Sequence, residues 1–293
     1  MKARTAPFDR LPEPTLVDLG PRGTTAIWDS GPVSEAGDEV PLVLLHGWNV
    51  NSFVNFGSAY KSLAKEHRII LIDLHGHGRG PRSAERFTIE ASVQDVIKAL
   101  DFLEVERAIF VGYSMGGLVA QLLARQAPER VSGIVLAATA ALFCAKDKIR
   151  WLQTRGLAAS TAVVARLPER ARHFVFLQIT AVACARYPRW VRDEVREADP
   201  VSLLSAGVAL LSFDSRDWIG DVEAPKVVIV TTEDRVVAPV QQRQLAVRSN
   251  AETILPIDAD HDLPIRNDPR FARILLTAVE ALDRTSTTDV SPG

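Results

Sequence analysis

The sequence Gly112-Tyr113-Ser114-Met115-Gly116 has the Gly-x-Ser-x-Gly pattern of residue types that suits nucleophilic chemistry. An apolar run typical of a strand precedes it over residues 107–113, and a helical run follows it over residues 118–127. At a sharp turn from strand to helix a serine hydroxyl projects clear of the sheet, and glycines two residues away leave room for the strained backbone. We therefore expect Ser114 to be a nucleophile, with Gly112 and Gly116 as structural residues of its turn. The alternative is an ordinary turn serine.

A serine hydroxyl needs a base to accept its proton and a third group to orient that base. In turns of this type the chain order is serine, acid, histidine. Asp234 follows the apolar run 226–232 and His261 follows the apolar run 252–257. This order predicts Asp234 as the orienting carboxylate and His261 as the base. The alternatives for the acid are its neighbours and two aspartates upstream: Glu233, Asp258, Asp260, Asp262, Asp214 and Asp217.

Acyl transfer also needs two N–H donors for the oxyanion of the tetrahedral intermediate. The residue after the nucleophile supplies one donor, here Met115, and a loop after an early strand supplies the other. That loop reads His46-Gly47-Trp48-Asn49, so we expect the backbone N–H of Trp48 to be the second donor. Gly47 leaves room for the close approach of the backbone, and His46 is expected to be a structural hydrogen-bonding residue. The Trp48 ring is expected to line the acyl pocket, to pack in the core, or both.

Short apolar runs typical of strands alternate with helical patterns along most of the chain. Several runs are apolar at consecutive positions, which is typical of strands covered on both faces in a parallel sheet. Apolar residues recur at helical spacing over residues 89–103 and 271–282, and residues 20–23 join two short N-terminal runs into an expected hairpin. The alternation predicts an α/β fold with a mostly parallel, doubly wound sheet. The predicted strands are 41–46, 68–74, 107–113, 131–139, 226–232 and 252–257.

The strand–helix alternation stops between residues 141 and 220, where the sequence reads as helical. We expect residues 141–220 to form a helical cap, inserted late in the sheet, over the carboxyl ends of its strands. Residues 1–140 and 221–293 would then form the core. The ends, residues 1–14 and 285–293, are rich in proline or polar residues and are expected to be disordered.

Charge and cysteine content exclude several classes of protein. The 34 Lys plus Arg nearly balance the 36 Asp plus Glu, which gives no reason to expect binding of nucleic acid. Cys144 and Cys184 lie too far apart for a zinc site or a disulfide scaffold, and His75 and His77 lack a third ligand at a usual spacing. The glycine-rich stretch 73–80 lacks both the Gly-x-Gly-x-x-Gly spacing that opens a helix and the Lys-Ser/Thr pair of a P-loop. It therefore predicts a turn. We expect neither a metal nor another cofactor.

The sequence shows no apolar run long enough for a bilayer, and no apolar core of a signal peptide follows Met1. We therefore expect a cytoplasmic protein without stable membrane insertion. It would act on a small-molecule substrate as a monomer or homodimer.

Several motifs together resemble the α/β-hydrolase superfamily, over roughly residues 9–284. The serine nucleophile resembles that of the esterase and lipase branch. The His-Gly-Trp loop is similar to that of epoxide hydrolases, dehalogenases and cofactor-free perhydrolases, of which the first two carry Asp where this chain has Ser114. The motifs are HGW at 46–48, DLHGHGRG at 73–80, GYSMGG at 112–117, TTEDRVVAP at 231–239 and DADHDLP at 258–264.

This resemblance implies a serine hydrolase that cleaves carboxylic esters of small to medium acyl groups, or lactones, through an acyl-enzyme. Thioesterase, carbon–carbon bond hydrolase and perhydrolase chemistry are alternatives within the superfamily, as is a non-catalytic ligand-binding member. Carbon–carbon bond hydrolases tend to have Trp after the base, where this chain has Asp262, and perhydrolases tend to have Pro in place of Asn49. The family's usual glycines before the acid and before the base are replaced by Thr231-Thr232 and by Asp260.

Overall fold

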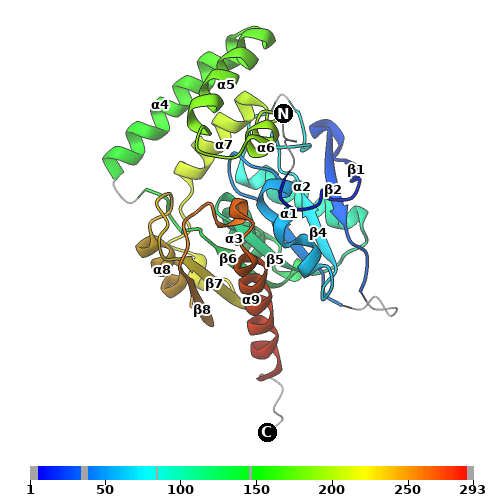
Figure 1. The fold of residues 1–293 in the computed structure, drawn as a ribbon. Helices are drawn as coiled ribbons and strands as arrows, with labels where there is room; N and C mark the ends of the chain where they lie inside the picture. Colours follow the sequence, from blue (N-terminus) through cyan, green and yellow to red (C-terminus); the bar gives the residue numbers. More distant parts are fainter. Residues whose placement is uncertain (1–5, 34–38, 84, 145–146, 289–293) are drawn as a thin grey trace.

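The computed structural model describes residues 6–33, 39–83, 85–144 and 147–288, and it is built around one sheet (Figure 1). The sheet has the strand order β1-β2-β4-β3-β5-β6-β7-β8. The first two strands form the expected hairpin and pair antiparallel, as do β2 and β4, and every other neighbour is parallel. The mostly parallel sheet is therefore confirmed. The strands are β1 Thr15–Asp18, β2 Thr24–Asp29, β3 Leu42–Leu45, β4 Ile69–Ile72, β5 Ala108–Tyr113, β6 Val131–Ala137, β7 Lys226–Thr231 and β8 Thr253–Ile257.

Helices cover both faces of this sheet, which explains the strands that are apolar at every position. All residues of β3, β4 and β5 are buried, because a parallel sheet between two helical layers leaves no face in water. One apolar core lies between the sheet and α1 (Ser52–Leu63) with α9 (Pro269–Thr288). The other includes α2, α3 and α8: Ile89–Phe102, Met115–Gln126 and Pro239–Arg248.

The helical cap expected late in the sheet is present between β6 and β7, and it stands above the core in Figure 1. Its helices occupy the interior of the predicted segment 141–220. They are α4 Asp147–Arg166, α5 Glu169–Ala183, α6 Arg189–Val195 and α7 Pro200–Ser212. Short 3-10 turns in the described residues are Gly20–Arg22, Pro128–Arg130, Ile219–Asp221 and Leu263–Arg266.

Residues 6–14 pack against the fold, so the expected disorder of residues 1–14 was wrong for this part. The Phe8 ring lies 5.4 Å from the Phe53 ring and 5.3 Å from the Trp190 ring, measured between centroids. Pro12 accepts a hydrogen bond of 2.8 Å from the Trp28 indole. Aromatic anchoring thus outweighs the effect of three prolines. At the other end α9 runs to Thr288, and residues 1–5 and 289–293 lie outside the described residues.

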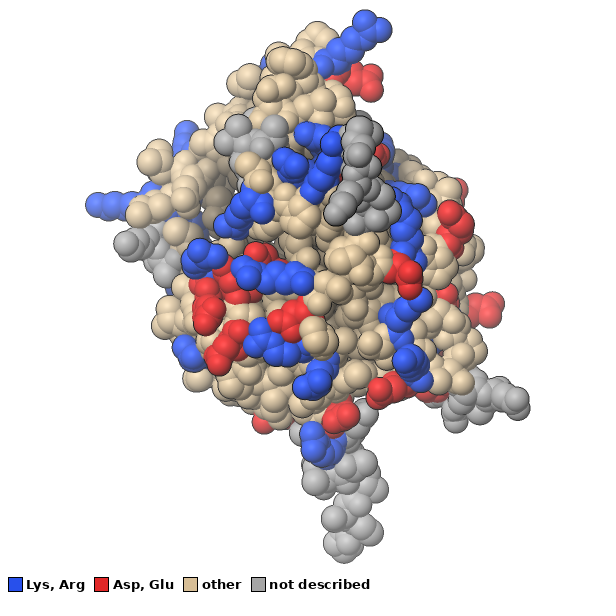
Figure 2. Space-filling view, viewed as in Figure 1, with Lys and Arg blue, Asp and Glu red and all other residues tan. Residues whose placement is uncertain are grey.

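The surface carries charges of both signs, in keeping with the formal net charge of −2. On the face shown in Figure 2, acidic and basic side chains are interspersed over the core, and basic side chains predominate on the cap. Within the described part of the chain, no helix combines the length and the apolar character needed to cross a membrane.

A buried ion pair joins the N-terminal hairpin to α2. The Arg22 guanidinium donates from Nε to Asp95 Oδ1 at 2.7 Å and from Nη2 to Asp95 Oδ2 at 2.8 Å. Both side chains are largely removed from water, with 11% and 3% of their surface exposed. In a buried ion pair each charge compensates the loss of water around the other. When one partner is removed, the remaining charge is buried without water and without its counter-charge.

We predict that Asp95→Ala lowers the free energy of unfolding by about 3–5 kcal/mol, since it leaves the Arg22 charge without its main partner. Urea unfolding followed by circular dichroism measures the loss. The control is Asp101→Ala, which breaks the more exposed Asp101–Arg130 pair and should lose only about 0–1 kcal/mol. Equal losses in the two variants would contradict the importance of the buried pair.

Candidate active site

Ser114 lies between β5 and α3 with φ 53° and ψ −116°, a conformation that residues other than glycine rarely adopt. Hydrogen bonds from the neighbouring strand hold it there. The Ser114 N–H donates to the Ala137 carbonyl at 2.9 Å, and the Thr139 hydroxyl donates to the Ser114 carbonyl at 2.7 Å. The turn therefore fixes the position of the Ser114 side chain before any substrate binds.

The glycines on either side are required by close backbone contacts. A Cβ atom on Gly112 would lie 2.5 Å from the Gly116 carbonyl oxygen, and one on Gly116 would lie 2.0 Å from the Leu45 carbonyl oxygen. Both distances are well inside van der Waals contact. Helix α3 can thus start directly against β3 and β5 only with glycine at these two positions.

The structure brings Ser114, His261 and Asp234 together at the carboxyl ends of β5, β8 and β7. His261 Nε2 lies 3.1 Å from Ser114 Oγ, and His261 Nδ1 lies 2.8 Å from Asp234 Oδ2. These distances are within the range for a nucleophile, its base and the group that orients the base. The His261 side chain is 18% exposed, so one edge of its ring remains accessible to water and to a small molecule.

Asp234 is fully buried at its side chain and is surrounded by donors. Its Oδ1 accepts from the N–H groups of Val236 and Val237 at 2.8 Å each, and its Oδ2 also accepts from the Thr231 hydroxyl at 2.7 Å. Burial alone would raise the pKa of Asp234, but the hydrogen bond and charge of His261 and the other donors outweigh burial and lower it. Asp234 is therefore ionised next to the His261 ring.

Four of the six other carboxylates considered for this role are engaged elsewhere. Asp214 pairs with Arg216, Asp260 pairs with Arg235, and Asp262 pairs with Arg266. Asp258 accepts from the Thr232 hydroxyl. Of the carboxylates in the described part of the chain, Asp234 is the one in contact with the His261 ring.

His46 and Asn55 orient the loop after β3. His46 Nε2 accepts from the Leu74 N–H at 2.9 Å, so its proton is on Nδ1, which donates to the Gly47 carbonyl at 2.8 Å. Burial lowers the pKa of His46, in keeping with a neutral ring. Asn55 Oδ1 accepts from the Gly47 N–H at 2.9 Å. Because the Gly47–Trp48 peptide is trans, the Trp48 N–H points away from the carbonyl that His46 holds.

The two residues expected to supply oxyanion donors belong to the segments that meet at Ser114. Met115 is the first residue of α3, so its N–H precedes the first hydrogen bond within that helix. A Cβ atom on Gly47 would lie only 3.3 Å from Ser114 Cβ, which shows how closely the loop approaches the nucleophile. Gly47 therefore allows this close approach of the loop, and Gly47, Trp48 and Ser114 line the same cavity.

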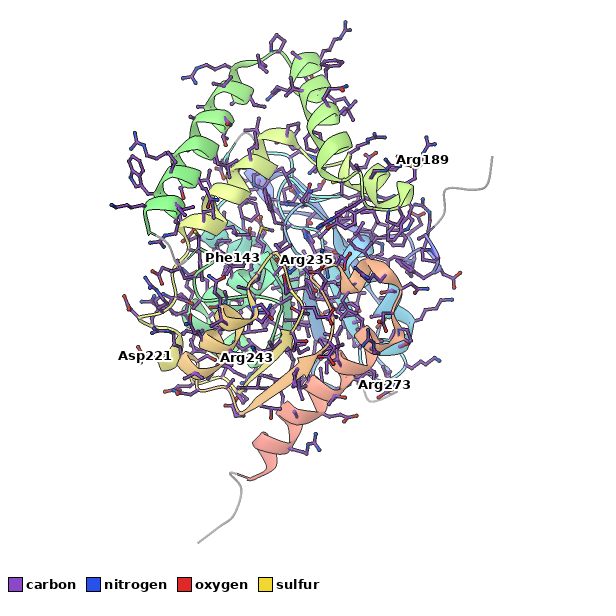
Figure 3. All side chains as sticks on the ribbon, turned by 60° about the vertical axis from the view of Figure 1, so that its left-hand side comes forward. Phe143, Arg189, Asp221, Arg235, Arg243 and Arg273 are labelled. Carbon is purple, nitrogen blue, oxygen red and sulfur yellow. The ribbon has the colours of Figure 1, made fainter. Side chains whose placement is uncertain are left out.

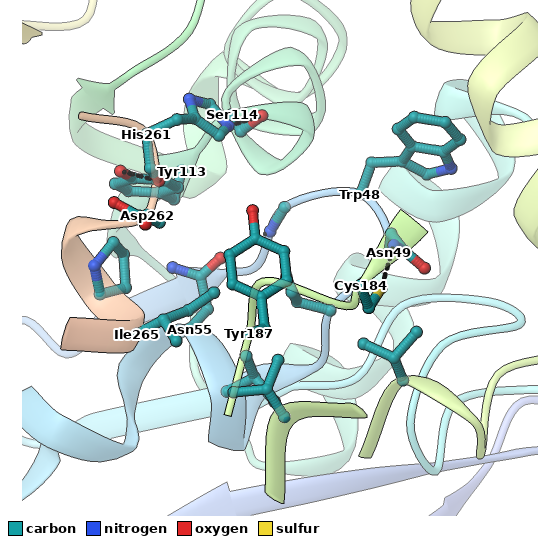
Figure 4. Close-up of a pocket in the computed structure, with 16 residues that line it drawn as sticks. Trp48, Asn49, Asn55, Tyr113, Ser114, Cys184, Tyr187, His261, Asp262 and Ile265 are labelled. Carbon is teal, nitrogen blue, oxygen red and sulfur yellow. Dashed lines mark hydrogen bonds between the residues drawn. The ribbon is translucent and has the colours of Figure 1, made fainter. Parts of the chain in front are cut away.

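A cavity of about 90 Å³ opens beside Ser114, between the core and the cap (Figure 4). In this view Tyr187 of the cap faces the pocket between the His261 side and the Trp48 side. Trp48 is 40% exposed and is one of the residues that form the wall. The wall also contains the aliphatic side chains of Val50, Val54, Val191, Val195 and Ile265.

Tyr113 and Asn55 are among the residues at the site that were not predicted from the sequence. Tyr113, inside the Gly-x-Ser-x-Gly motif, donates from its hydroxyl to the His261 carbonyl at 3.0 Å, and burial followed by the charge of Asp234 raises its pKa well above the usual value. Asn55 holds Gly47 from the buried face of α1. A polar residue within an apolar helical stripe is a signal that could have identified Asn55.

The described residues contain no group of three or more His, Cys, Asp or Glu side chains that could hold a metal ion. His75 and His77 are buried in the turn after β4, and the His77 ring contacts the His75 carbonyl at 2.9 Å. Burial, followed by repulsion from His46, lowers the pKa of His77 to about 3. The ring is therefore a neutral part of the core.

Comparison with known proteins adds named relatives. Residues 40–268 match the family described as alpha/beta hydrolase fold. A pimeloyl-(acyl-carrier protein) methyl ester esterase of Sodalis glossinidius is 31% identical over 189 residues, which cover 63% of this chain and 71% of that protein. The enzyme of the same name from Chromobacterium violaceum is 28% identical over 257 residues, covering 85% and 97%.

Solved structures share the fold at lower identity. The enol-lactonase from Burkholderia xenovorans LB400 matches with a TM-score of 0.68 and 24% identity, over 91% of this chain and 100% of that one. A thermophilic esterase from Thermogutta terrifontis matches with a TM-score of 0.72 and 20% identity, over 92% and 99%. With the sheet order, the late cap and the family match over residues 40–268, these results show that the chain belongs to the alpha/beta hydrolase fold family.

Proposed function

We propose that this chain is a serine hydrolase that cleaves carboxylic esters through an acyl-enzyme intermediate. The observation that carries the proposal is the unbroken line of contacts from Ser114 Oγ through the His261 ring to Asp234, at the edge of an apolar cavity. The names of the relatives support it, since two of them are methyl ester esterases.

In the first half-reaction His261 Nε2 accepts the Ser114 proton while Oγ forms a bond to the ester carbonyl carbon. The carbonyl electron pair moves to oxygen, and the N–H groups of Trp48 and Met115 stabilise the resulting oxyanion. When the carbonyl re-forms, the bond to the alkoxy group breaks, and protonated His261 gives its proton to the departing alcohol. The alcohol leaves, and the acyl group stays bonded to Ser114.

In the second half-reaction water takes the place of Ser114 as nucleophile. His261 accepts a proton from water, the hydroxide adds to the acyl carbon, and the carboxylic acid departs as Ser114 recovers its proton. The ionised Asp234 stabilises the positive charge that His261 carries in both halves and keeps the proton of the neutral ring on Nδ1.

The cavity favours a short acyl group. The cavity of about 90 Å³ is small for a ligand site, so its wall can surround a short acyl group more completely than a long one. The aliphatic wall favours an unbranched or modestly branched alkyl group. We therefore propose small acyl esters as substrates, with lactones as the cyclic form of the same bond.

Asp260, which replaces a glycine of the family pattern, joins the two loops that carry the acid and the base. Its carboxylate accepts from the backbone N–H groups of Arg235 at 3.0 Å and His261 at 2.8 Å. It also pairs with the Arg235 guanidinium, which lies at the rim beneath the cap in Figure 3. Burial alone would raise the pKa of Asp260, but these donors, Arg235 first, lower it to about 2.

From the sequence alone, we also propose that the protein acts in the cytoplasm as a monomer or homodimer on a small-molecule ester, without nucleic-acid binding. Its small formal net charge of −2 supports the last point.

Replacing Ser114 by Ala should lower kcat for p-nitrophenyl butyrate by at least about 10³-fold, because it removes the hydroxyl that forms the acyl-enzyme in the proposed mechanism. The same variant should no longer be labelled by a fluorophosphonate probe. The matched control is Ser160→Ala, an exposed serine of α4 outside the pocket, which should behave as the wild type. Wild-type turnover by Ser114→Ala would refute the proposed function.

The cavity predicts a preference among p-nitrophenyl esters. The value of kcat/KM should fall at least about tenfold from butyrate to decanoate, because the longer chain does not fit. Val191→Ala, which removes two methyl groups from the cap wall, should narrow this difference, and Val247→Ala on the exposed face of α8 should leave it unchanged. A panel without any length preference would contradict the size of the pocket.

Asp260→Asn should lower the free energy of unfolding at neutral pH, because the charged partner of Arg235 is lost. The folded pKa of about 2 lies below the value of about 3.9 for an unfolded aspartate, so the stabilisation is complete above about pH 4 and is lost toward pH 2. Urea unfolding at pH 7, 5 and 3 should therefore show a gap between wild type and variant that narrows only at the lowest pH. Asp258→Asn, on the same loop but exposed, is the control.

A further inference from the structure

Trp48 contacts the site with its backbone and the cap with its side chain. Its backbone N–H is the proposed oxyanion donor of the loop after β3. Its indole Nε1–H donates to the Leu203 carbonyl of α7 at 2.8 Å. One residue therefore connects the position of a cap helix to the position of an N–H group beside the nucleophile.

A glycine in α7 makes this contact possible. In an α-helix the carbonyl of residue 203 points toward residue 207, one turn later. Residue 207 is Gly, and a Cβ atom there would lie 2.7 Å from Leu157 Cδ2 of α4, 3.0 Å from Trp48 Cζ2 and 3.4 Å from Trp48 Cε2. The indole therefore lies directly against the backbone of α7, and a side chain at position 207 would press both on it and on Leu157 of α4. The Trp48→Phe variant separates these two effects.

Helix α7 is itself fixed to the core, independently of Trp48. At its N-terminus the Asp199 N–H donates to the Gly76 carbonyl at 2.8 Å, and the Ser205 hydroxyl accepts from the Phe87 N–H at 3.1 Å. Gly76 meets the helix so closely that a Cβ atom there would lie 2.0 Å from Ser202 Cβ. The helix thus has a defined place above the sheet edge.

We propose that α7 sets the position of the oxyanion donor, with the Leu203 carbonyl and Gly207 acting as positioning residues for Trp48. His46 and Asn55 hold the Gly47 side of this loop, and α7 holds it from the Trp48 side chain. A displacement of about 1 Å in a catalytic group can lower a rate by about 100-fold, so a fixed support for this N–H has a direct effect on turnover. This inference rests on the proposed ester hydrolysis.

The first test is Gly207→Ala, with Gly156→Ala as its matched control. Both add one methyl group to a cap helix, but a Cβ atom at Gly156 meets nothing within 4 Å. Alanine favours a helix in both variants, so neither should lose thermal stability for reasons of helix propensity. Gly207→Ala should lower kcat for p-nitrophenyl butyrate by about 10- to 100-fold with KM within about threefold of wild type, and Gly156→Ala should leave kcat unchanged.

The second test is Trp48→Phe, which keeps an aromatic ring but removes the Nε1–H donor. Its kcat should also fall, by about tenfold, with little change in KM. Phenylboronic acid, whose adduct with the serine places an oxygen in the oxyanion site, should bind more weakly to both variants by the same factor as kcat falls. Inhibition by butyrate, the product, should change little. A loss of folding alone would not produce this parallel.

The outcomes separate the inference from the function on which it rests. If Ser114→Ala is inactive while Trp48→Phe and Gly207→Ala keep wild-type kcat and boronate affinity, α7 does not position the donor and the inference is wrong. If Gly207→Ala does not fold, Trp48→Phe alone decides by the same readouts. If Ser114→Ala remains active, the proposed function fails first.

Discussion

The strained backbone of Ser114 is the constraint on which the site depends. A non-glycine residue at positive φ is about 1–3 kcal/mol less stable than in an ordinary conformation, so its surroundings must impose it. The hydrogen bonds from Ala137 and Thr139 do this from the end of β6. These hydrogen bonds require β6 to lie beside β5, and the close contact of Gly116 with Leu45 requires α3 to begin against β3. The order of the parallel strands provides both arrangements.

The same sheet edge brings the acid and the base to the serine. Asp234 follows β7 and His261 follows β8, and parallel pairing of these strands makes their carboxyl ends neighbours. Hydrogen bonds then fix the exact positions of these two side chains. The N–H groups of Val236 and Val237 donate to Asp234, and the Tyr113 hydroxyl donates to the His261 carbonyl. Backbone N–H groups and a few buried hydroxyl groups together thus hold Ser114, Asp234 and His261 at one edge of the sheet.

The sequence was sufficient for those parts of the fold and site that are encoded locally. Apolar runs and helical spacing predicted the parallel sheet and the late cap, and the order of Ser114, Asp234 and His261 predicted three residues that the structure places in contact. Contacts between distant segments carried no local signal. The packing of Phe8 on Trp190, the Asp260–Arg235 pair and the Trp48 indole on α7 each depend on how separate elements meet in space.

The packing of Phe8 has a consequence for the handling of the protein. This side chain touches Phe53 at the start of α1 and Trp190 in α6, and α6 also supplies Val191 and Val195 to the wall of the pocket. The segment before β1 therefore bridges the two halves of the molecule beside the substrate cavity. An affinity tag or a shortened N-terminal boundary that displaces Phe8 would remove a packing partner of α6, the helix that forms part of the cavity wall.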